Sequence, residues 1–111
     1  MYLTKEEAVR LFHEQWSDMQ KELGDCPSPY SRALFKRIWC DRHFPKENIE
    51  DDCFLCEYAR QYDHKCSNCP IKWSSDNCCV HREYGGVHFL YNRISEILAL
   101  PVREEAANGE Q

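Results

Sequence analysis

The chain has 111 residues, with 14 lysines and arginines against 19 aspartates and glutamates, which gives a net charge of −5. This length is typical of a single domain, and a hydrophobic fraction of 42% argues against an intrinsically disordered chain. No apolar run approaches the ~18 residues that a membrane-spanning helix needs, and residues 1–10 lack the apolar segment of a secretory signal. We therefore expect a cytoplasmic protein with no membrane partner.

The first predicted element is a helix over residues 4–23. Thr4 and Glu7 have the spacing of a capping box, in which each side chain accepts a hydrogen bond from the other residue's backbone N–H. Gly24 then stands where a helix often ends in a left-handed conformation. Steps of three or four residues separate the side chains of one apolar face, which are Ala8, Phe12, Trp16, Met19 and Leu23.

The second predicted helix starts at Ser28, with Pro29 at its first helical position, and extends to Arg42. Phe44 ends this helix, because a residue that precedes proline is disfavoured in the helical region. The expected apolar positions are Tyr30, Leu34 and Ile38, and Phe35 and Trp39 extend this surface.

The remaining residues predict less regular structure. Residues 53–62 could form a short helix capped by Asp51 or Asp52, and a last helical stripe spans residues 87–98 and closes at Pro101. The fold class that we expect is mainly α, a small helical domain with three to four helices and a zinc-pinned cysteine-rich loop region. Its boundaries are residues 1–102, followed by a polar tail at 103–111.

Cysteine spacing carries the strongest chemical signal. Six of the eight cysteines lie between Cys53 and Cys79, and four of them form the pattern C-x2-C-x9-C-x2-C. Disulfides favour oxidising compartments, whereas two C-x-x-C pairs can complete the closed tetrahedral shell of a structural zinc ion. Zinc is therefore preferred over disulfides and over an iron–sulfur or redox role. The expected ligands of one structural Zn²⁺ are Cys53, Cys56, Cys66 and Cys69.

The ligand set has two possible substitutes, since Cys78 and Cys79 follow closely and either could replace Cys66 or Cys69. The other two cysteines are expected to stay outside the metal site: Cys26 in a loop that contains proline and Cys40 on the second helix. No Ser-His-Asp, P-loop or H-E-x-x-H signature is present, so we do not expect an enzyme.

The charge of the chain is unevenly distributed. Residues 30–46 hold five cations and one carboxylate, a net charge of +4, whereas residues 47–63 hold six carboxylates and one arginine, a net charge of −5. This basic helix is either a solvated face or a contact surface for phosphate or an acidic partner. The candidate contact residues are Arg32, Lys36, Arg37 and Arg42. Four thiolates with one zinc ion would add a charge of −2, which favours docking on a basic protein surface.

Two segments carry a resemblance to a known group of proteins. Residues 53–59 read CFLCEYA and residues 66–73 read CSNCPIKW, with Cys78 shortly downstream. This arrangement resembles small, largely uncharacterised cysteine-rich proteins encoded by bacteriophages and prophages of Gram-positive bacteria. The resemblance implies zinc binding and an intracellular location in the host cytoplasm. The chain departs from that group at Cys79 and at the Gly85-Gly86 break.

These observations lead to one expected function and one alternative. We expect a zinc-stabilised, non-enzymatic phage-type protein that binds a host macromolecule. Its specific form is an inhibitor of a host defence nuclease, such as an anti-CRISPR protein, with a nucleic-acid-handling enzyme as the partner. The alternative is a zinc-finger protein that binds nucleic acid directly or regulates transcription.

Overall fold

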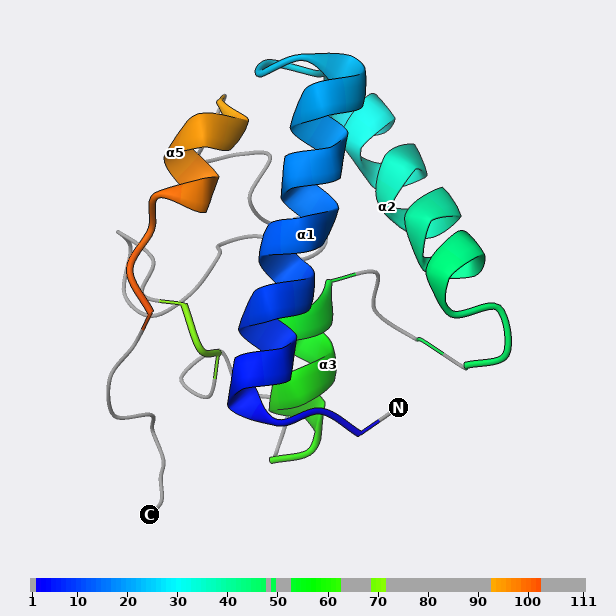
Figure 1. The fold of residues 1–111 in the computed structure, drawn as a ribbon, viewed down its shortest axis with the longest axis vertical. Coiled ribbons are helices and arrows are strands. Elements are labelled where there is room, and N and C mark those ends of the chain that lie inside the picture. Colours follow the sequence, from blue (N-terminus) through cyan, green and yellow to red (C-terminus); the bar gives the residue numbers. More distant parts are fainter. Residues whose placement is uncertain (1, 48, 50–52, 63–68, 72–92, 103–111) are drawn as a thin grey trace.

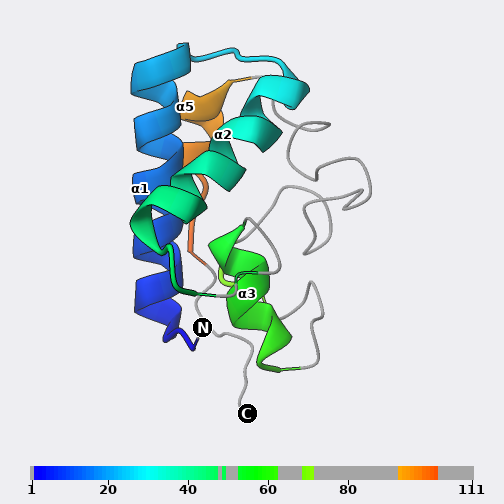
Figure 2. The same cartoon turned by 90° about the vertical axis from the view of Figure 1, so that its right-hand side faces the viewer.

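The computed structural model describes residues 2–47, 49, 53–62, 69–71 and 93–102. The described part is mainly helical, as the sequence predicts, with helices α1 (Lys5–Leu23), α2 (Pro29–His43), α3 (Phe54–Arg60) and α5 (Ile94–Leu98). Helix α1 occupies the centre and packs against the other three, with α2 and α5 flanking it in Figure 1. Figure 2 shows α2 running obliquely across α1, above α3. Residues 87–92 of the last predicted helix and the predicted tail at 103–111 lie outside the described residues.

Helix α1 begins and ends as its sequence predicts. The Thr4 hydroxyl accepts a hydrogen bond from the Glu7 N–H at 3.1 Å, and the Glu7 carboxylate accepts one from the Thr4 N–H at 2.9 Å. At the other end Gly24 has a φ of 86°, and its N–H donates to the Gln20 carbonyl at 2.9 Å. A side chain at this position would be strained, so glycine fixes the end of the helix.

Helix α2 also matches its predicted boundaries closely. Ser28 is the N-cap, and its hydroxyl accepts a hydrogen bond from the Ser31 N–H at 3.2 Å. The helix ends at His43, one residue beyond the prediction, and the Phe44 N–H still donates to the Cys40 carbonyl at 2.9 Å. The next residue, Pro45, has no N–H to continue the pattern.

The buried face of α1 joins two hydrophobic clusters. One, the Trp16 cluster, combines residues from α1, α3, the short segment 69–71 and α5; its buried members are Phe12, Trp16, Met19, Leu55, Cys69, Ile71, Ile94 and Ile97. The other, the Trp39 cluster, is formed by Leu3, Ala8, Leu11, Trp39, Cys40, Ile49 and Phe54. An isolated antiparallel bridge between Ile71 and Val102 holds the segment 69–71 beside the C-terminal end of the described chain.

The buried face of α2 differs from the predicted one. Tyr30, Leu34 and Ile38 are exposed, whereas the side that contains Trp39 faces the core. Trp39 buries its indole edge-on against the Phe54 ring at a centroid distance of 5.6 Å, and its ring N–H donates to the Asp18 carboxylate at 2.8 Å. Because an indole buries more apolar surface than a leucine or isoleucine and also finds a polar partner here, its side of the helix turns inward.

Helix α3 begins at Phe54, and its N-cap is Cys53 rather than a residue before it. The predicted caps Asp51 and Asp52 lie outside the described residues. Just beyond the other end of α3, the Gln61 side-chain amide pairs with the backbone of Leu3: the Leu3 N–H donates to Gln61 Oε1 at 2.7 Å, and Gln61 Nε2 donates to the Leu3 carbonyl at 3.0 Å. This pair ties the start of the chain to α3.

Asp25 connects the loop between α1 and α2 to the short helix α5. Its carbonyl accepts a hydrogen bond from the Ile94 N–H at 2.8 Å. Its carboxylate accepts bonds from the Ser95 N–H at 2.8 Å, the Ser95 hydroxyl at 3.0 Å and the Gln20 amide at 2.9 Å. The bonds from Gln20 and Ser95 hold the pKa of Asp25 below its ordinary value, because they stabilise the charged form.

The first prediction concerns acid stability. Asp25→Asn should lower the melting temperature at pH 7, because the amide cannot accept the same set of hydrogen bonds. Since the pKa of Asp25 is lower in the folded chain than in the unfolded chain, its stabilisation is present above the ordinary value of about 3.9 and is lost as pH falls through the folded pKa. The melting temperatures of wild type and Asp25→Asn, measured from pH 2 to 7, should therefore converge in acid.

The matched control is Glu22→Gln, which removes an exposed carboxylate. Equal melting temperatures of Asp25→Asn and wild type at pH 7 would refute the stabilising role of Asp25.

Candidate functional site

Cys53 and Cys56 lie at the N-terminal end of α3. Cys53 is the half-buried N-cap, and Cys56 is the third residue of the helix. The Cys53 carbonyl accepts hydrogen bonds from the N–H groups of Cys56 and Glu57, both at 3.1 Å, so the first turn brings the two cysteines to one end of the helix. This is the local geometry that a C-x-x-C pair offers to a thiophilic metal ion.

The Cys53 thiol has marked thiolate character. A side-chain hydrogen bond from Cys56 contributes most to this effect, followed by the positive charge of Lys36 and the backbone N–H groups of Cys56 and Leu55. Burial acts in the opposite direction, and together these influences lower the pKa of Cys53 to about 6. A thiol must lose its proton to bind a metal, so the surroundings of Cys53 favour the form that binds.

Cys69 lies in the neighbouring core. It is a buried member of the Trp16 cluster, against which Cys53 also packs. Within the described ranges, no three His, Cys, Asp or Glu side chains converge closely enough to form a ligand set. Cys66, Cys78 and Cys79 lie outside those ranges. The structure thus pairs two of the predicted ligands and places a third in the same core, while the rest of the predicted set is not described.

Two cations from α2 lie over the Trp16 ring. The Lys36 ammonium is 5.5 Å from a ring centroid of Trp16, and the Arg32 guanidinium carbon is 5.9 Å from it. The Trp16 indole is buried, and its N–H has no hydrogen-bond partner among the residues that the structure describes. A cation over an indole ring is attracted by the negative face of the ring, so these two contacts help to hold α2 against α1.

The four predicted contact residues of α2 separate into different environments. Arg32 is buried with only 2% of its surface exposed, and its Nε donates to the Pro27 carbonyl at 3.2 Å. Arg37 is exposed and pairs with Asp41 at 3.6 Å. Arg42 is exposed at the end of the helix, where it lines a groove. The structure therefore divides these four side chains between the interior and the surface.

Burial also affects the charge of Arg32. Loss of hydration lowers the pKa of its guanidinium, and the neighbouring Cys26 and Asp25 act in the opposite direction. The group remains a cation at neutral pH, because the arginine guanidinium does not lose its proton in proteins. Arg32 is thus an internal positive charge that connects α2 to the Pro27 loop and to Trp16.

An apolar groove lies between α2 and the C-terminal half of α1. It has a volume of about 460 Å³, and its lining residues are Asp18, Lys21, Glu22, Leu23, Ser31, Leu34, Phe35, Ile38, Trp39, Arg42 and His43. Three large apolar side chains at this groove are exposed, with Leu23 at 39%, Leu34 at 49% and Ile38 at 43%. Tyr30, one turn before Leu34, is 77% exposed. Such a cluster on an otherwise charged surface is typical of a protein contact.

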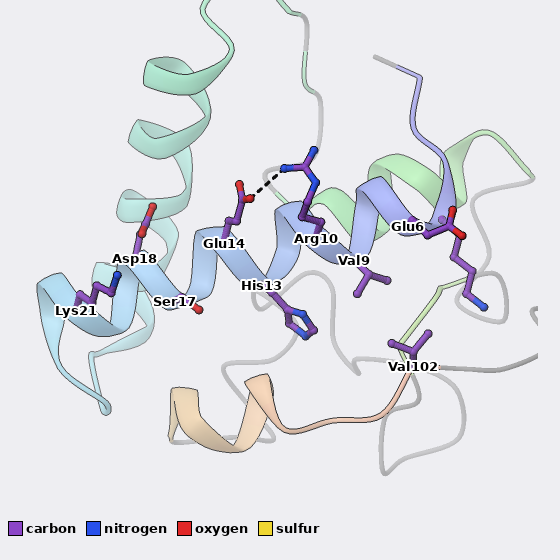
Figure 3. Close-up of a pocket in the computed structure, with 10 residues that line it drawn as sticks. Glu6, Val9, Arg10, His13, Glu14, Ser17, Asp18, Lys21 and Val102 are labelled. Carbon is purple, nitrogen blue, oxygen red and sulfur yellow. Dashed lines mark hydrogen bonds and ion pairs between the residues drawn. The ribbon is translucent and has the colours of Figure 1, made fainter.

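A second groove follows the outer side of α1 and reaches Val102. Its volume is about 760 Å³, and its walls carry charges of both signs; the lining residues are Lys5, Glu6, Val9, Arg10, His13, Glu14, Ser17, Asp18, Lys21 and Val102. Figure 3 shows Arg10 paired with Glu14, at 3.0 Å, while His13 extends on the side toward Val102. His13 Nε2 is buried without a hydrogen-bond partner among the described residues. The alternating charges of this groove favour neither an anion nor a cation.

The two cysteines that we expected outside the metal site differ in their surroundings. Cys26 is exposed in the loop before α2. Cys40 is buried in the Trp39 cluster, where its sulfur accepts a hydrogen bond from the Gln15 amide at 3.6 Å. His43, which has C-x-x-H spacing to Cys40, instead stacks on the Trp39 ring at 3.8 Å.

Comparisons with known proteins give no relatives: no family model, curated protein or solved structure matches the chain. Among the described helices, none is both long enough and apolar enough to cross a membrane.

Sequence reasoning missed the positions of Lys36 and Arg32 relative to Trp16. Lys36 was expected on the surface, and no local motif connects it to Cys53, since they belong to different elements. Arg32 offered a usable signal: Arg32, Phe35 and Trp39 follow one another at steps of three and four, so they share one face of α2. If Trp39 is assigned to the core, Arg32 is expected to be buried as well, because it lies on the same face of α2.

Arg32 supplies the second prediction. Arg32→Met keeps much of the side-chain length but leaves the half-buried Pro27 carbonyl without the Arg32 donor and removes the cation above Trp16. The free energy of unfolding should fall by about 1–3 kcal/mol, as for the loss of a charged hydrogen bond. Urea denaturation measures this change. Arg37→Met, at an exposed position one turn and a half away, is the control and should stay within ~0.5 kcal/mol of wild type. Equal effects of the two substitutions would exclude a structural role for Arg32.

Proposed function

We propose that this protein is a zinc-stabilised binding protein that acts on another protein by occupying its surface, without catalysis of its own. The observation that carries the proposal is the apolar groove between α1 and α2, bordered by exposed Leu23, Leu34 and Ile38. In a chain with 30% charged residues, exposed apolar side chains gathered at one groove are best explained by a partner that covers them.

The metal part of the proposal rests on thiol placement. Cys53 and Cys56 share one turn at the start of α3, and Cys69 is buried in the cluster on which Cys53 packs. A zinc ion bound by cysteines with no open position stabilises a fold but supplies no catalytic water. In this arrangement Cys66 would complete the set, with Cys78 and Cys79 as its possible substitutes. The ion would then cross-link α3 to the segment that contains Cys69.

The partner that we propose is a protein with a basic surface. The chain carries a net charge of −5, and a zinc ion held by four thiolates would lower it to about −7. Direct binding of nucleic acid receives less support, because Arg32 is buried and Arg37 is paired with Asp41. With Arg32 buried and Arg37 in a surface ion pair, α2 offers fewer unpaired cations to phosphate groups than its composition suggests.

The resemblance to phage-encoded proteins gives the proposal its specific form. A phage protein that binds a basic surface of a host enzyme could block the channel that this enzyme uses for nucleic acid. We therefore propose inhibition of a host defence nuclease, as by an anti-CRISPR protein. Direct binding to DNA or RNA is the alternative that the experiments must separate from it.

The third prediction concerns zinc content. Protein purified from cells should contain one zinc ion per chain, measured by elemental mass spectrometry against protein concentration. Cys53→Ser and Cys69→Ser should each lose most of this zinc, because a serine hydroxyl does not replace a thiolate. Cys26→Ser, at an exposed cysteine outside the site, should keep it. Zinc-free wild-type protein, or full zinc content in both ligand variants, would rule out the proposed centre.

The fourth prediction concerns the groove. A double variant with Leu34→Glu and Ile38→Glu should lose host-protein capture and nuclease inhibition at least tenfold, because charged side chains would replace the apolar contact. Tyr2→Glu, at a 73% exposed aromatic residue outside the groove, is the control and should behave as wild type. Circular dichroism checks that all three proteins are folded.

Two results would contradict this prediction. Equal capture and inhibition by the double variant and the Tyr2 control would show that the groove is not the contact surface. Binding to DNA or RNA that falls steeply with salt, with no protein partner detected, would support the nucleic-acid alternative instead.

A further inference from the structure

We propose that the protein forms a reversible two-fold homodimer, in which an exposed stripe of α2 packs against the same stripe of a second copy. The stripe consists of Tyr30, Leu34, Ile38 and Arg42, which follow one another at steps of four residues. It borders the groove to which we assign host binding, and in this respect the inference rests on the proposed function. A second copy covers the groove until a host protein displaces it.

All four side chains of this stripe are open to solvent. Tyr30 is the most exposed, and Leu34 and Ile38 each keep nearly half of their surface in water. Arg42 is exposed as well, and among the residues that the structure describes no carboxylate forms an ion pair with it. The stripe therefore offers a partner both apolar surface and an available cation.

The order of residues along the stripe makes it complementary to itself. A two-fold axis between Leu34 and Ile38 places Leu34 of one copy opposite Ile38 of the second copy, at the centre of the contact. At each end the same axis places Arg42 of one copy at the Tyr30 ring of the other, where the negative face of the ring attracts the cation. Two apolar contacts and two cation–ring contacts thus form together, and the two Arg42 side chains stay at opposite ends.

The spacing of the stripe also suits direct contact between helices. Residues at steps of four form a ridge on an α-helix, and two such ridges interdigitate when the helices cross at about −50°. This crossing keeps Leu34 and Ile38 in close contact, while the long side chains of Tyr30 and Arg42 can still meet where the helices diverge. The remaining exposed ion pair of α2, Arg37–Asp41, is formed within one chain and needs no second copy.

The size of the contact sets its strength. Stable protein interfaces bury about 1,200–2,000 Å² in total, and a single helical stripe from each copy falls toward or below the lower end of this range. We therefore expect a weak dimer with a dissociation constant in the micromolar range. A weak dimer suits a groove that must open for a host protein, because a tight one would block it permanently.

Sedimentation velocity of the full-length protein, measured over a wide concentration range, tests this inference. Wild type should change from monomer to dimer at micromolar concentrations. Leu34→Glu and Ile38→Lys should each weaken the dimer about tenfold, because each places a charge opposite an apolar side chain. Arg42→Gln, which removes the cation at the Tyr30 ring, should weaken it several-fold. Tyr2→Glu, outside the stripe, is the control and should associate as wild type does.

An equimolar mixture of the Leu34→Glu and Ile38→Lys proteins tests the two-fold geometry itself. The mixture should recover the dimer, because the introduced carboxylate of one chain then faces the introduced ammonium of the other. The unchanged isoleucine and leucine keep their contact on the opposite side of the axis. Circular dichroism checks that each variant is folded.

Two outcomes overturn the inference. Wild-type protein that stays monomeric throughout the range would leave the host protein as the sole occupant of the groove. A mixture that stays monomeric while wild type dimerises would show that the dimer uses another surface or register. The proposed function fails by a different result, in which the double variant with Leu34→Glu and Ile38→Glu still inhibits the host nuclease, whatever its association state.

Discussion

The described structure depends on the buried stripe of α1. Its positions contribute to both hydrophobic clusters, so α2, α3 and α5 are each placed by packing against the same helix. The capping box at Thr4 and the left-handed Gly24 fix the length of this helix, and Asp25 then binds α5 directly after it. In a small domain with a limited core, one well-capped central helix makes the shorter elements possible.

The same helix provides the connection between the core and the cysteines. Trp16 lies under the cations of α2 and belongs to the same cluster as Cys69. Helix α3 has only seven residues and starts at Cys53, so little of its stability can come from its own hydrogen bonds. A metal ion that joined Cys53 and Cys56 to the segment of Cys69 would add the long-range cross-link that this short helix lacks. Binding and folding would then be coupled in this half of the chain.

Local sequence signals predicted the elements well, and the orientation of α2 poorly. The boundaries of α1 and α2 follow from capping residues and from Gly24 and Pro45, whose effects act over a few neighbouring residues. Which side of α2 faces the core depends on which apolar stripe packs against other elements. Trp39 packs against the Phe54 ring and donates a hydrogen bond to Asp18, and both residues are distant from it in sequence. The C-x-x-C spacing predicted the closeness of Cys53 and Cys56. It could not predict that Lys36 lies over the Trp16 ring, because that contact arises only when α1 and α2 pack.

The central claim is that cysteine thiolates hold one structural zinc ion beside the α1 core. X-ray absorption at the zinc edge of the purified, zinc-loaded protein tests this claim most directly, since it measures the donor atoms and their distances. The account predicts four sulfur donors at about 2.3 Å, the distance of zinc–thiolate bonds. A first shell dominated by nitrogen or oxygen at about 2.0–2.1 Å would contradict the account, because the ion would then be bound by groups other than these cysteines.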